Sequence, residues 1–568
     1  MLTNRRNTFV ISQALRNFLG ASILTSVSSQ LAVTTDAIVV GNLVGPDAVS
    51  AINITMPINM LFSCVSILIG LGASILSARA IGSRENSKVN HIFSVALLLL
   101  VALGATVSIF TYTRCENIMS LICSDERIYP LAVEYADVIT GGAIFLILSN
   151  GINYFVSTDG APSLVAKGVI AGAVANILLD ILLVGFMGIS GSAWATVINY
   201  TVTLAIVCTH FKKKSCSYRL VNPFRGLARQ AVGNIYEGLP LMLGNMLLGV
   251  AVLVINKMIL SATGADGLYI WSICLQVLLL TFVVLNGVGN AILSIGGILV
   301  GERDYNGVRI LTRISLKFVC TVVAIFVVAV MIFPQFLSFI FGNNSGNMIY
   351  GTDNALRIFS LLLVPFAITL IMRLLFQILE YRILSLLMSA GQLAFIIASL
   401  WIFIGIDPEI LWWSFPFSAV MLIVIQITAT AALWLKRRDI SPITLIPKVN
   451  RNSIDLSIAY RKESIEKAID EIRDFLSQSD IDKIKTDGFI ECFRKVAVHV
   501  AGTGNKKKGS FDVHIHNRHS GISTTLRASG EKFTELITDT AHNIEFKYMY
   551  GQNVVFIKQA DRCPTPAQ

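Results

Sequence analysis

Charged residues are scarce in this chain. They make up 14% of its 568 residues, whereas 54% are hydrophobic, and the mean hydropathy is +0.69. A soluble globular chain has about a quarter of its residues charged, so this deficit favours a membrane protein. The charge is also unevenly placed: residues from about 15 to 435 form successive apolar runs, and the remainder reads as a soluble domain.

Metal-binding cysteine patterns are missing as well. The nine cysteines form no CxxC motif and no Cys/His ligand spacing, which argues against a zinc or redox protein. The first apolar run lacks a small-residue cleavage site, so we expect a retained helix rather than a signal peptide. The net charge of +10 comes from short Lys/Arg clusters between apolar runs, a pattern typical of cytoplasmic loops and not of nucleic-acid binding.

The apolar runs predict an all-α polytopic protein with twelve transmembrane helices, since each run provides the roughly 20 residues that a span needs. We place them at 16–40, 54–80, 92–113, 133–155, 164–186, 191–210, 238–261, 269–299, 312–333, 356–378, 382–405 and 411–435. Basic clusters follow spans two, six and twelve, whereas the loop at 41–53 has no basic residue. The positive-inside rule therefore predicts a bacterial-type inner-membrane protein with both termini in the cytoplasm.

The chain also repeats itself. The stretch Gly70-Leu-Gly-Ala-Ser-Ile-Leu-Ser77 is echoed by Gly287-Val-Gly-Asn-Ala-Ile-Leu-Ser294. Such repeats are typical of transporters whose two halves rock about a central site. We therefore expect two pseudo-symmetric six-helix lobes, 1–210 and 236–438, joined by a basic cytoplasmic linker at 211–235.

Three segments resemble the multidrug and toxic compound extrusion (MATE) family. They are Asp36–Gly41 with Gly45–Ala48 and Gly70–Gly72, then Asn176–Asp180 with Gly188, Gly191 and Ala195-Thr196, and finally Gly238-Leu-Pro240. The resemblance implies a V-shaped, ion-coupled efflux antiporter that exports organic cations or amphiphiles in exchange for H⁺ or Na⁺. It implies a transporter rather than an enzyme, with no cofactor. It also implies ion coupling, including a Na⁺ site, at Asp36, Asn176, Asp180 and Thr196.

The two acids are informative without the resemblance. A carboxylate at membrane depth costs at least about 2.5–3.5 kcal/mol on insertion scales, so its presence indicates function. Asn176 and Asp180 are one helical turn apart and face the same side. With Asp36 and Thr196 they predict an oxygen cage for a hard cation or a proton relay. The alternatives are that Asp36 meets water at the outer interface and that Asp180 anchors a helix end.

The second lobe has no matching pair of acids. Its ionisable groups are Glu237, Lys257 and Arg373. We expect Glu237 at the cytoplasmic interface, and Lys257 and Arg373 snorkelling from helix ends. Ion coupling is therefore expected in the first lobe.

The segment 450–568 predicts a small cytoplasmic α/β sandwich, with strands at 453–459, 509–516, 521–527, 543–549 and 552–558 and helices at 462–477 and 480–501. It resembles the histidine-kinase-like ATPase fold of anti-sigma-factor kinases. The motif residues of that fold are replaced: Glu491, Lys495 and His499 stand where Glu, Asn and His are expected, and Ala528-Ser529-Gly530 replaces Asp-x-Gly. The glycine-rich lid is also missing between Lys532 and Leu536. The resemblance thus implies a degenerate domain that does not hydrolyse ATP.

These patterns define the expected partners: the lipid bilayer, a cationic or amphiphilic small molecule and a cytoplasmic regulatory protein at the C-terminal domain, but no nucleic acid. Two other functions remain open. One is a lipid or polysaccharide flippase of the same superfamily, and the other is a membrane sensor that signals through the C-terminal domain.

Overall fold

The chain forms two compact units in a computed structural model that describes residues 8–123, 125–336, 349–448, 452–477, 483–503, 510–518, 521–533 and 542–559. The larger unit comprises Leu19–Gly301 and Thr312–Leu445. The smaller unit comprises Met1–Phe18, Glu302–Leu311 and Ile446–Gln568. The C-terminal segment therefore shares one compact unit with two short segments from the helical part of the chain.

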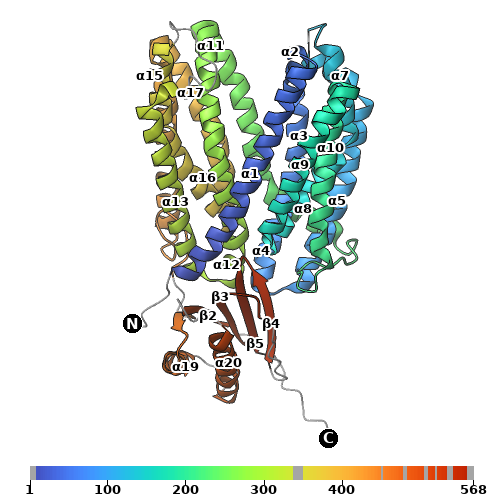
Figure 1. Cartoon of the computed structure of the whole chain (residues 1–568). Helices are drawn as coiled ribbons and strands as arrows, with labels where there is room; N and C mark the ends of the chain where they lie inside the picture. The colour runs from blue at the N-terminus through green and yellow to red at the C-terminus, as the bar shows by residue number, and fades with distance from the viewer. Residues whose placement is uncertain are drawn as a thin grey trace. The chain divides into compact units, whose positions relative to one another are not determined.

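The helical part consists of two successive sets of helices, which lie as two groups in Figure 1. The first set is α1 (Phe9–Leu43), α2 (Pro46–Ile54), α3 (Met56–Ser66), the π-helical turn η1 (Ile67–Leu71), α4 (Gly72–Ser83), α5 (Asn86–Thr113), α6 (Cys115–Ile122), α7 (Tyr129–Gly141), α8 (Ala143–Thr158), α9 (Pro162–Met187), α10 (Ile189–Cys208) and the 3₁₀ turn η2 (Thr209–Lys212). The second set is α11 (Leu227–Ala291), the π-helical turn η3 (Ile292–Gly296), α12 (Gly297–Glu302), α13 (Tyr305–Ile332), α15 (Ile349–Ser360), α16 (Leu363–Ile378), α17 (Arg382–Ile406), the 3₁₀ turn η4 (Pro408–Trp413) and α18 (Ser414–Lys436).

The number of spans agrees with the sequence pattern. Among the described residues, ten helices are long and apolar enough to cross a membrane, or eleven when the pair α7–α8, bent by 52°, forms one span. The long helix α11 also breaks at Gly264, whose φ of 70° and ψ of −159° are not helical. Glycine permits this backbone because it has no Cβ. Since α11 thus provides two spans, the described helices account for twelve.

Glycines allow the two sets of helices to approach each other closely. A Cβ added to Gly238 of α11 would lie 2.0 Å from the Leu68 carbonyl oxygen, and one added to Gly72 would lie 2.6 Å from the Gly238 nitrogen. Further along, a Cβ on Gly301 would lie 2.1 Å from the Arg79 carbonyl oxygen. These contacts form a seam between α4 with η1 on one side and α11 with α12 on the other. Glycine is required there because backbone meets backbone.

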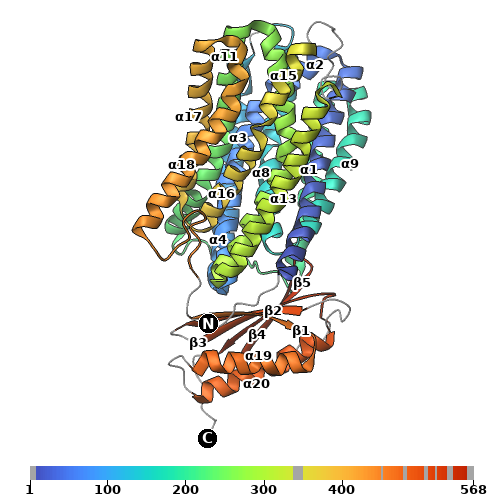
Figure 2. The ribbon, with the colours of Figure 1, turned by 90° about the vertical axis from the view of Figure 1, so that its left-hand side faces the viewer.

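The C-terminal segment is a five-stranded antiparallel sheet with two helices. The strands are β1 (Ser453–Ala459), β2 (Ser510–Arg518), β3 (Gly521–Ser529), β4 (His542–Met549) and β5 (Gln552–Gln559), in the order β1-β2-β3-β5-β4. The helices α19 (Lys462–Ser477) and α20 (Lys483–Thr503) cover one face (Figure 2). Each element coincides with the predicted one to within a few residues.

Alternation along the strands gives this sheet two different faces. On β2, Phe511, Val513 and Ile515 belong to the apolar core that includes α19 and α20. The intervening side chains point to the other face because successive strand residues alternate. Two of them, Asp512 and His514, are also buried, so the second face is polar and yet shielded from water.

Candidate ion-coupling site

The four residues expected to couple ions come together inside the first set of helices. Asp36 comes from α1, Asn176 and Asp180 from α9, and Thr196 from α10. The exposed fractions of Asp36, Asn176 and Asp180 are 9%, 1% and 0%. The Asp36 carboxyl interacts with the side chains of Asp180, Asn176 and Thr196, and Thr196 Oγ1 donates to Asp36 Oδ2 at 3.5 Å. Three helices thus contribute to one buried polar cluster.

Most polar atoms of this cluster make no hydrogen bond of normal geometry, although the side chains lie close enough to interact. Within the described part of the chain, Asp36 Oδ1, both carboxylate oxygens of Asp180 and both amide atoms of Asn176 have no hydrogen bond of normal geometry. Unpaired buried polar groups are rare in proteins, and a cluster of them indicates a functional site. Two adjacent buried carboxylates repel each other unless one holds a proton or a cation lies between them. The cluster is therefore chemically suited to bind H⁺ or a small cation.

The alternatives for the two acids disagree with these positions. Asp36 is buried against α9 and α10 rather than exposed near Asn42, and Asp180 lies within α9, which continues to Met187.

Sequence reasoning missed three residues around the cluster. Tyr135 of α7 interacts with both Asp36 and Thr196, Ser192 of α10 with Asp180, and Tyr200 of α10 with Asp36. Their only signal in the sequence is a hydroxyl within an apolar run, which many membrane helices contain without function. Only the tertiary packing of the helices shows that these three side chains lie beside the acids.

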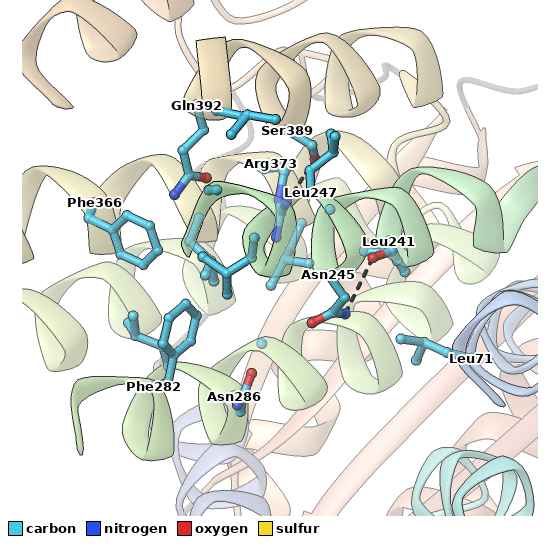
Figure 3. A pocket seen from close by; sticks show the side chains of 18 of the residues that line it. Leu71, Leu241, Asn245, Leu247, Phe282, Asn286, Phe366, Arg373, Ser389 and Gln392 are labelled. Atoms are coloured by element: carbon cyan, nitrogen blue, oxygen red, sulfur yellow. Dashed lines mark hydrogen bonds between the residues drawn. The ribbon is translucent and has the colours of Figure 1, made fainter. Parts of the chain in front are cut away.

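A cavity lies on the second set of helices (Figure 3). Its volume is ≈120 Å³, and its lining is mostly Leu, Ile and Phe side chains from η1, α11, α16 and α17, together with η3 residue Leu293. The polar side chains in the lining are Asn245, Asn286, Asn290, Arg373, Ser389 and Gln392. Arg373 Nη1 donates to Ser389 Oγ at 2.7 Å. The expectation that Arg373 snorkels from a helix end is wrong, because the packing of α16 against α17 holds it beside the cavity.

Glu237 is fully buried, which the sequence did not predict. It is 0% exposed and accepts bonds from Arg79 Nη2 at 3.0 Å and Arg382 Nε at 2.6 Å. Gln377 Nε2 donates to its Oε1 at 3.0 Å. This network joins α4 to α11, α16 and α17 at the seam. The sequence could not show these contacts, because the partners are 158 and 145 residues away in the chain.

The nucleotide-motif residues of the C-terminal domain have other contacts. Lys495 Nζ pairs with Glu491 Oε1 at 3.2 Å on an exposed helix face. The His499 ring lies 5.6 Å from that of Phe533, edge to face. Ala528 is buried in the sheet and Gly530 follows β3 with a φ of 146°. The predicted lid region extends to Leu536 and lies partly outside the described residues, which stop at 533 and resume at 542.

Two repeated sets of apolar helices around a buried polar cluster define a multi-pass membrane protein. Residues 21–182 and 240–402 each match the MatE family. The two matches cover more than half of the sequence, and the chain belongs to this family. The double match also agrees with the internal repeat.

Curated relatives are similar to this chain over part of their length. The chain is 24% identical over 220 residues to "Probable multidrug resistance protein YoeA" of Bacillus subtilis, covering 38% of this chain and 48% of the relative. It is 27% identical over 224 residues to "Multidrug export protein MepA" of Staphylococcus aureus, covering 38% and 49%. The chain thus spans about half the length of the curated relatives it matches.

Solved structures share the fold over a larger region. A MATE protein crystallised with MaL6 matches with a TM-score of 0.68 at 21% identity, covering 75% of this chain and 95% of that one. A multidrug resistance MATE family transporter in an outward-facing conformation gives the same values, as does a MOP superfamily transporter from Pyrococcus furiosus. At this identity the likeness establishes the fold alone.

Proposed function

We propose that this chain is a secondary active multidrug exporter that moves amphiphilic substrates out of the cell in exchange for H⁺ or Na⁺. The observation that carries this proposal is the buried cluster of Asp36, Asn176, Asp180 and Thr196 with its unpaired oxygens. Membership of the MatE family and the multidrug-export names of the relatives support it. The basic clusters favour an orientation with both termini in the cytoplasm.

In the proposed mechanism, cation capture changes the packing of three helices. With no cation, the Asp36 and Asp180 carboxylates repel each other across the gap between α1 and α9. A proton or Na⁺ removes this repulsion, so α1 draws towards α9 and α10 and substrate leaves outward. Release of the cation to the inside resets the helices. A membrane potential contributes about 2.3 kcal/mol per elementary charge per 100 mV to this cycle.

We place the substrate against the apolar cavity lined by α11, α16 and α17. Its aromatic and aliphatic lining suits the apolar body of an amphiphile, and its amides suit polar substituents. The Arg373 guanidinium favours a substrate that presents a hydrogen-bond acceptor to it. A permanently cationic group would bind away from Arg373.

The test is transport by the purified full chain in proteoliposomes, with ethidium as one substrate and a neutral amphiphilic dye as another. Imposed proton and sodium gradients are compared separately, which also identifies the coupling ion. Asp36→Asn and Asp180→Asn are expected to reduce gradient-driven flux to that of protein-free liposomes. Asp47→Asn is the matched control, because Asp47 is an acid of the same half that is exposed. Gradient-driven flux at the wild-type rate in both site variants would overturn the assignment.

We further propose that the C-terminal domain regulates transport without hydrolysing ATP. The Asn that holds Mg²⁺ in the fold it resembles is Lys495 here, and the Lys495 ammonium is occupied by Glu491. Phosphoryl transfer depends on a bound metal ion, and this helix does not supply the ligand for one.

A further inference from the structure

The polar face of the C-terminal sheet is unusual because it is buried. Asp455 of β1, His514 of β2 and Arg527 of β3 lie on the face opposite α19 and α20, with exposed fractions of 2%, 3% and 7%. Burial of charged groups is costly unless they are paired and hydrogen-bonded. A face of this composition therefore requires partners from outside the sheet.

The first partner is the α12–α13 turn, which we define as Glu302, the last residue of α12, and the connection 303–304 that leads to α13. Arg527 Nη2 pairs with Glu302 Oε2, and Arg527 Nη1 lies 3.5 Å from Asp304 Oδ2. His514 Nδ1 lies 2.7 Å from Asp455 Oδ1 and 4.0 Å from Asp304 Oδ1. Glu302 and Asp304 are themselves 5% and 0% exposed. The ionic partners of the sheet are thus supplied by this chain.

The second partner is the beginning of α1. Gln552 Nε2 donates to the Val10 carbonyl oxygen, and Asn17 Nδ2 donates to the Tyr550 carbonyl oxygen at 2.9 Å. The rings of Phe18 and Tyr550 are 5.8 Å apart. All of these groups belong to the smaller compact unit.

A metal ion is not needed to hold this cluster together. Asp304, Asp455 and His514 offer ligand atoms within 4.8 Å of one another, which is a spacing that a metal could bridge. The Arg527 guanidinium, however, already brings positive charge to Asp304 and Glu302. A cation placed between the two aspartates would be repelled by it.

We propose that the polar face of the sheet is an intramolecular lock, which binds the beginning of α1 and the α12–α13 turn and so restrains opening of the transporter on the cytoplasmic side. The two bound segments come from different halves: most of α1 lies in the first family match and the α12–α13 turn in the second. Glu302 also directly follows Gly301, whose backbone packs against Arg79 at the seam. Separation of the halves at the seam therefore requires this turn to move or the lock to release it. The transport consequence rests on the function and orientation proposed above, whereas the lock itself does not.

The test is hydrogen–deuterium exchange of the full chain in lipid nanodiscs, read in peptides covering 9–18, 302–311 and the seam at 72–83. Arg527→Glu is expected to accelerate exchange by about a hundredfold in the first two segments, because it leaves Glu302 and Asp304 buried without a counter-charge. Exchange in the seam is expected to rise as well. The double variant Glu302→Arg/Arg527→Glu restores the ion pair and is expected to restore protection in 302–311.

The matched control is Arg494→Glu. Arg494 pairs with Glu466 at 2.9 Å, and both side chains are 45% exposed on the helices of the same domain. This variant is expected to leave all three peptides as in the wild type. Arg527→Gln keeps the size of the side chain approximately and serves if the reversal prevents folding.

Exchange in 302–311 that is equal in Arg527→Glu, Arg527→Gln and wild type would overturn the lock. Faster exchange in 302–311 without any change in the seam would overturn its role as a restraint on opening. Neither readout requires transport, so failure of the proposed function is detected separately in the proteoliposome assay.

Discussion

At the residue scale, the buried charges of this membrane protein fall into two kinds. Glu237 is surrounded by two arginines and an amide donor, whereas the described residues provide no cationic side chain in the interactions of Asp36 and Asp180. A satisfied buried pair holds one arrangement in place. Carboxylates that lack a fixed cationic side chain can bind and release a mobile cation or a proton. This difference gives Glu237 an architectural role and is the reason why we propose the two aspartates as the coupling groups.

Removal of the Glu237 charge tests the architectural role. Glu237→Gln takes the shared carboxylate from Arg79 and Arg382, although Arg79 keeps Glu380 Oε1 at 3.2 Å. It is expected to destabilise the chain by about 1–3 kcal/mol, because buried donors lose their acceptor. Thermal unfolding in detergent measures the effect. Glu85→Gln is the control, since the Lys88–Glu85 pair is exposed on both sides and is worth about 0–1 kcal/mol. Equal midpoints for the two variants would contradict the role given to Glu237.

The thiol of Cys216 gives a prediction on pH dependence. Burial, with a further contribution from the charge of Asp159, raises the pKa of Cys216 to about 12. A raised thiol pKa keeps the unreactive protonated form at pH 7–9, so alkylation by iodoacetamide should become fast only well above pH 9. Mass spectrometry of the folded chain across pH measures this. Asp159→Asn is expected to shift the profile to lower pH, and an unchanged profile in that variant would remove Asp159 as a cause.

At the scale of elements, the seam depends on glycine where helices cross backbone to backbone. The Gly238-Leu-Pro240 motif that signalled the family lies at the closest of these crossings, against Leu68. Gly191 is similar, because an added Cβ would lie 2.4 Å from the backbone of Leu183. Gly185 lies nearby in the chain, but a Cβ added to it would have no atom within 4 Å. A glycine in these helices is therefore informative only once its neighbours are known.

The seam can be tested by adding one methyl group. Gly238→Ala is expected to cost about 1–3 kcal/mol or more and to reduce export, since the Leu68 carbonyl cannot move aside without shifting its helix. Gly185→Ala is the matched control and should be neutral or slightly stabilising, because alanine favours the helix. Melting curves and dye efflux measure both variants. A Gly238→Ala protein as stable and active as the control would show that the seam is not tightly packed.

At the scale of the whole molecule, the C-terminal domain forms one compact unit with the beginning of α1 and the α12–α13 turn. Its apolar face is filled by α19 and α20, and its polar face by the beginning of α1 and the α12–α13 turn. This arrangement is the reason why we propose that the domain regulates transport through movement of these segments, without chemistry of its own.

ATP provides the test of that view. The full chain in detergent is expected to bind Mg-ATP too weakly to detect at micromolar concentration and to release no phosphate. Lys495→Asn, which restores the residue type expected at that motif position, is not expected to restore hydrolysis, because the adenine-recognising Asp is still replaced by Ala528. Isothermal titration calorimetry and a phosphate-release assay measure these outcomes. Micromolar binding by the wild type would show that the domain has kept its nucleotide site.

The sequence alone predicted the helical membrane fold, the repeat and the residues of the acidic cluster. These features follow from local properties: a span needs a continuous apolar run, and an acid within such a run is costly wherever the fold places it. The strands and helices of the C-terminal domain were likewise readable, because alternation and amphipathic periodicity are local patterns.

Only the tertiary structure decided which side chains meet across long stretches of sequence. Tyr135, Ser192 and Tyr200 lie around the acids. Glu237 is buried between two arginines, and Arg373 lines a cavity. Arg527 pairs with Glu302. The physical reason is that the energy of a buried charge depends on its partners in space, and these lie up to 301 residues apart in the chain.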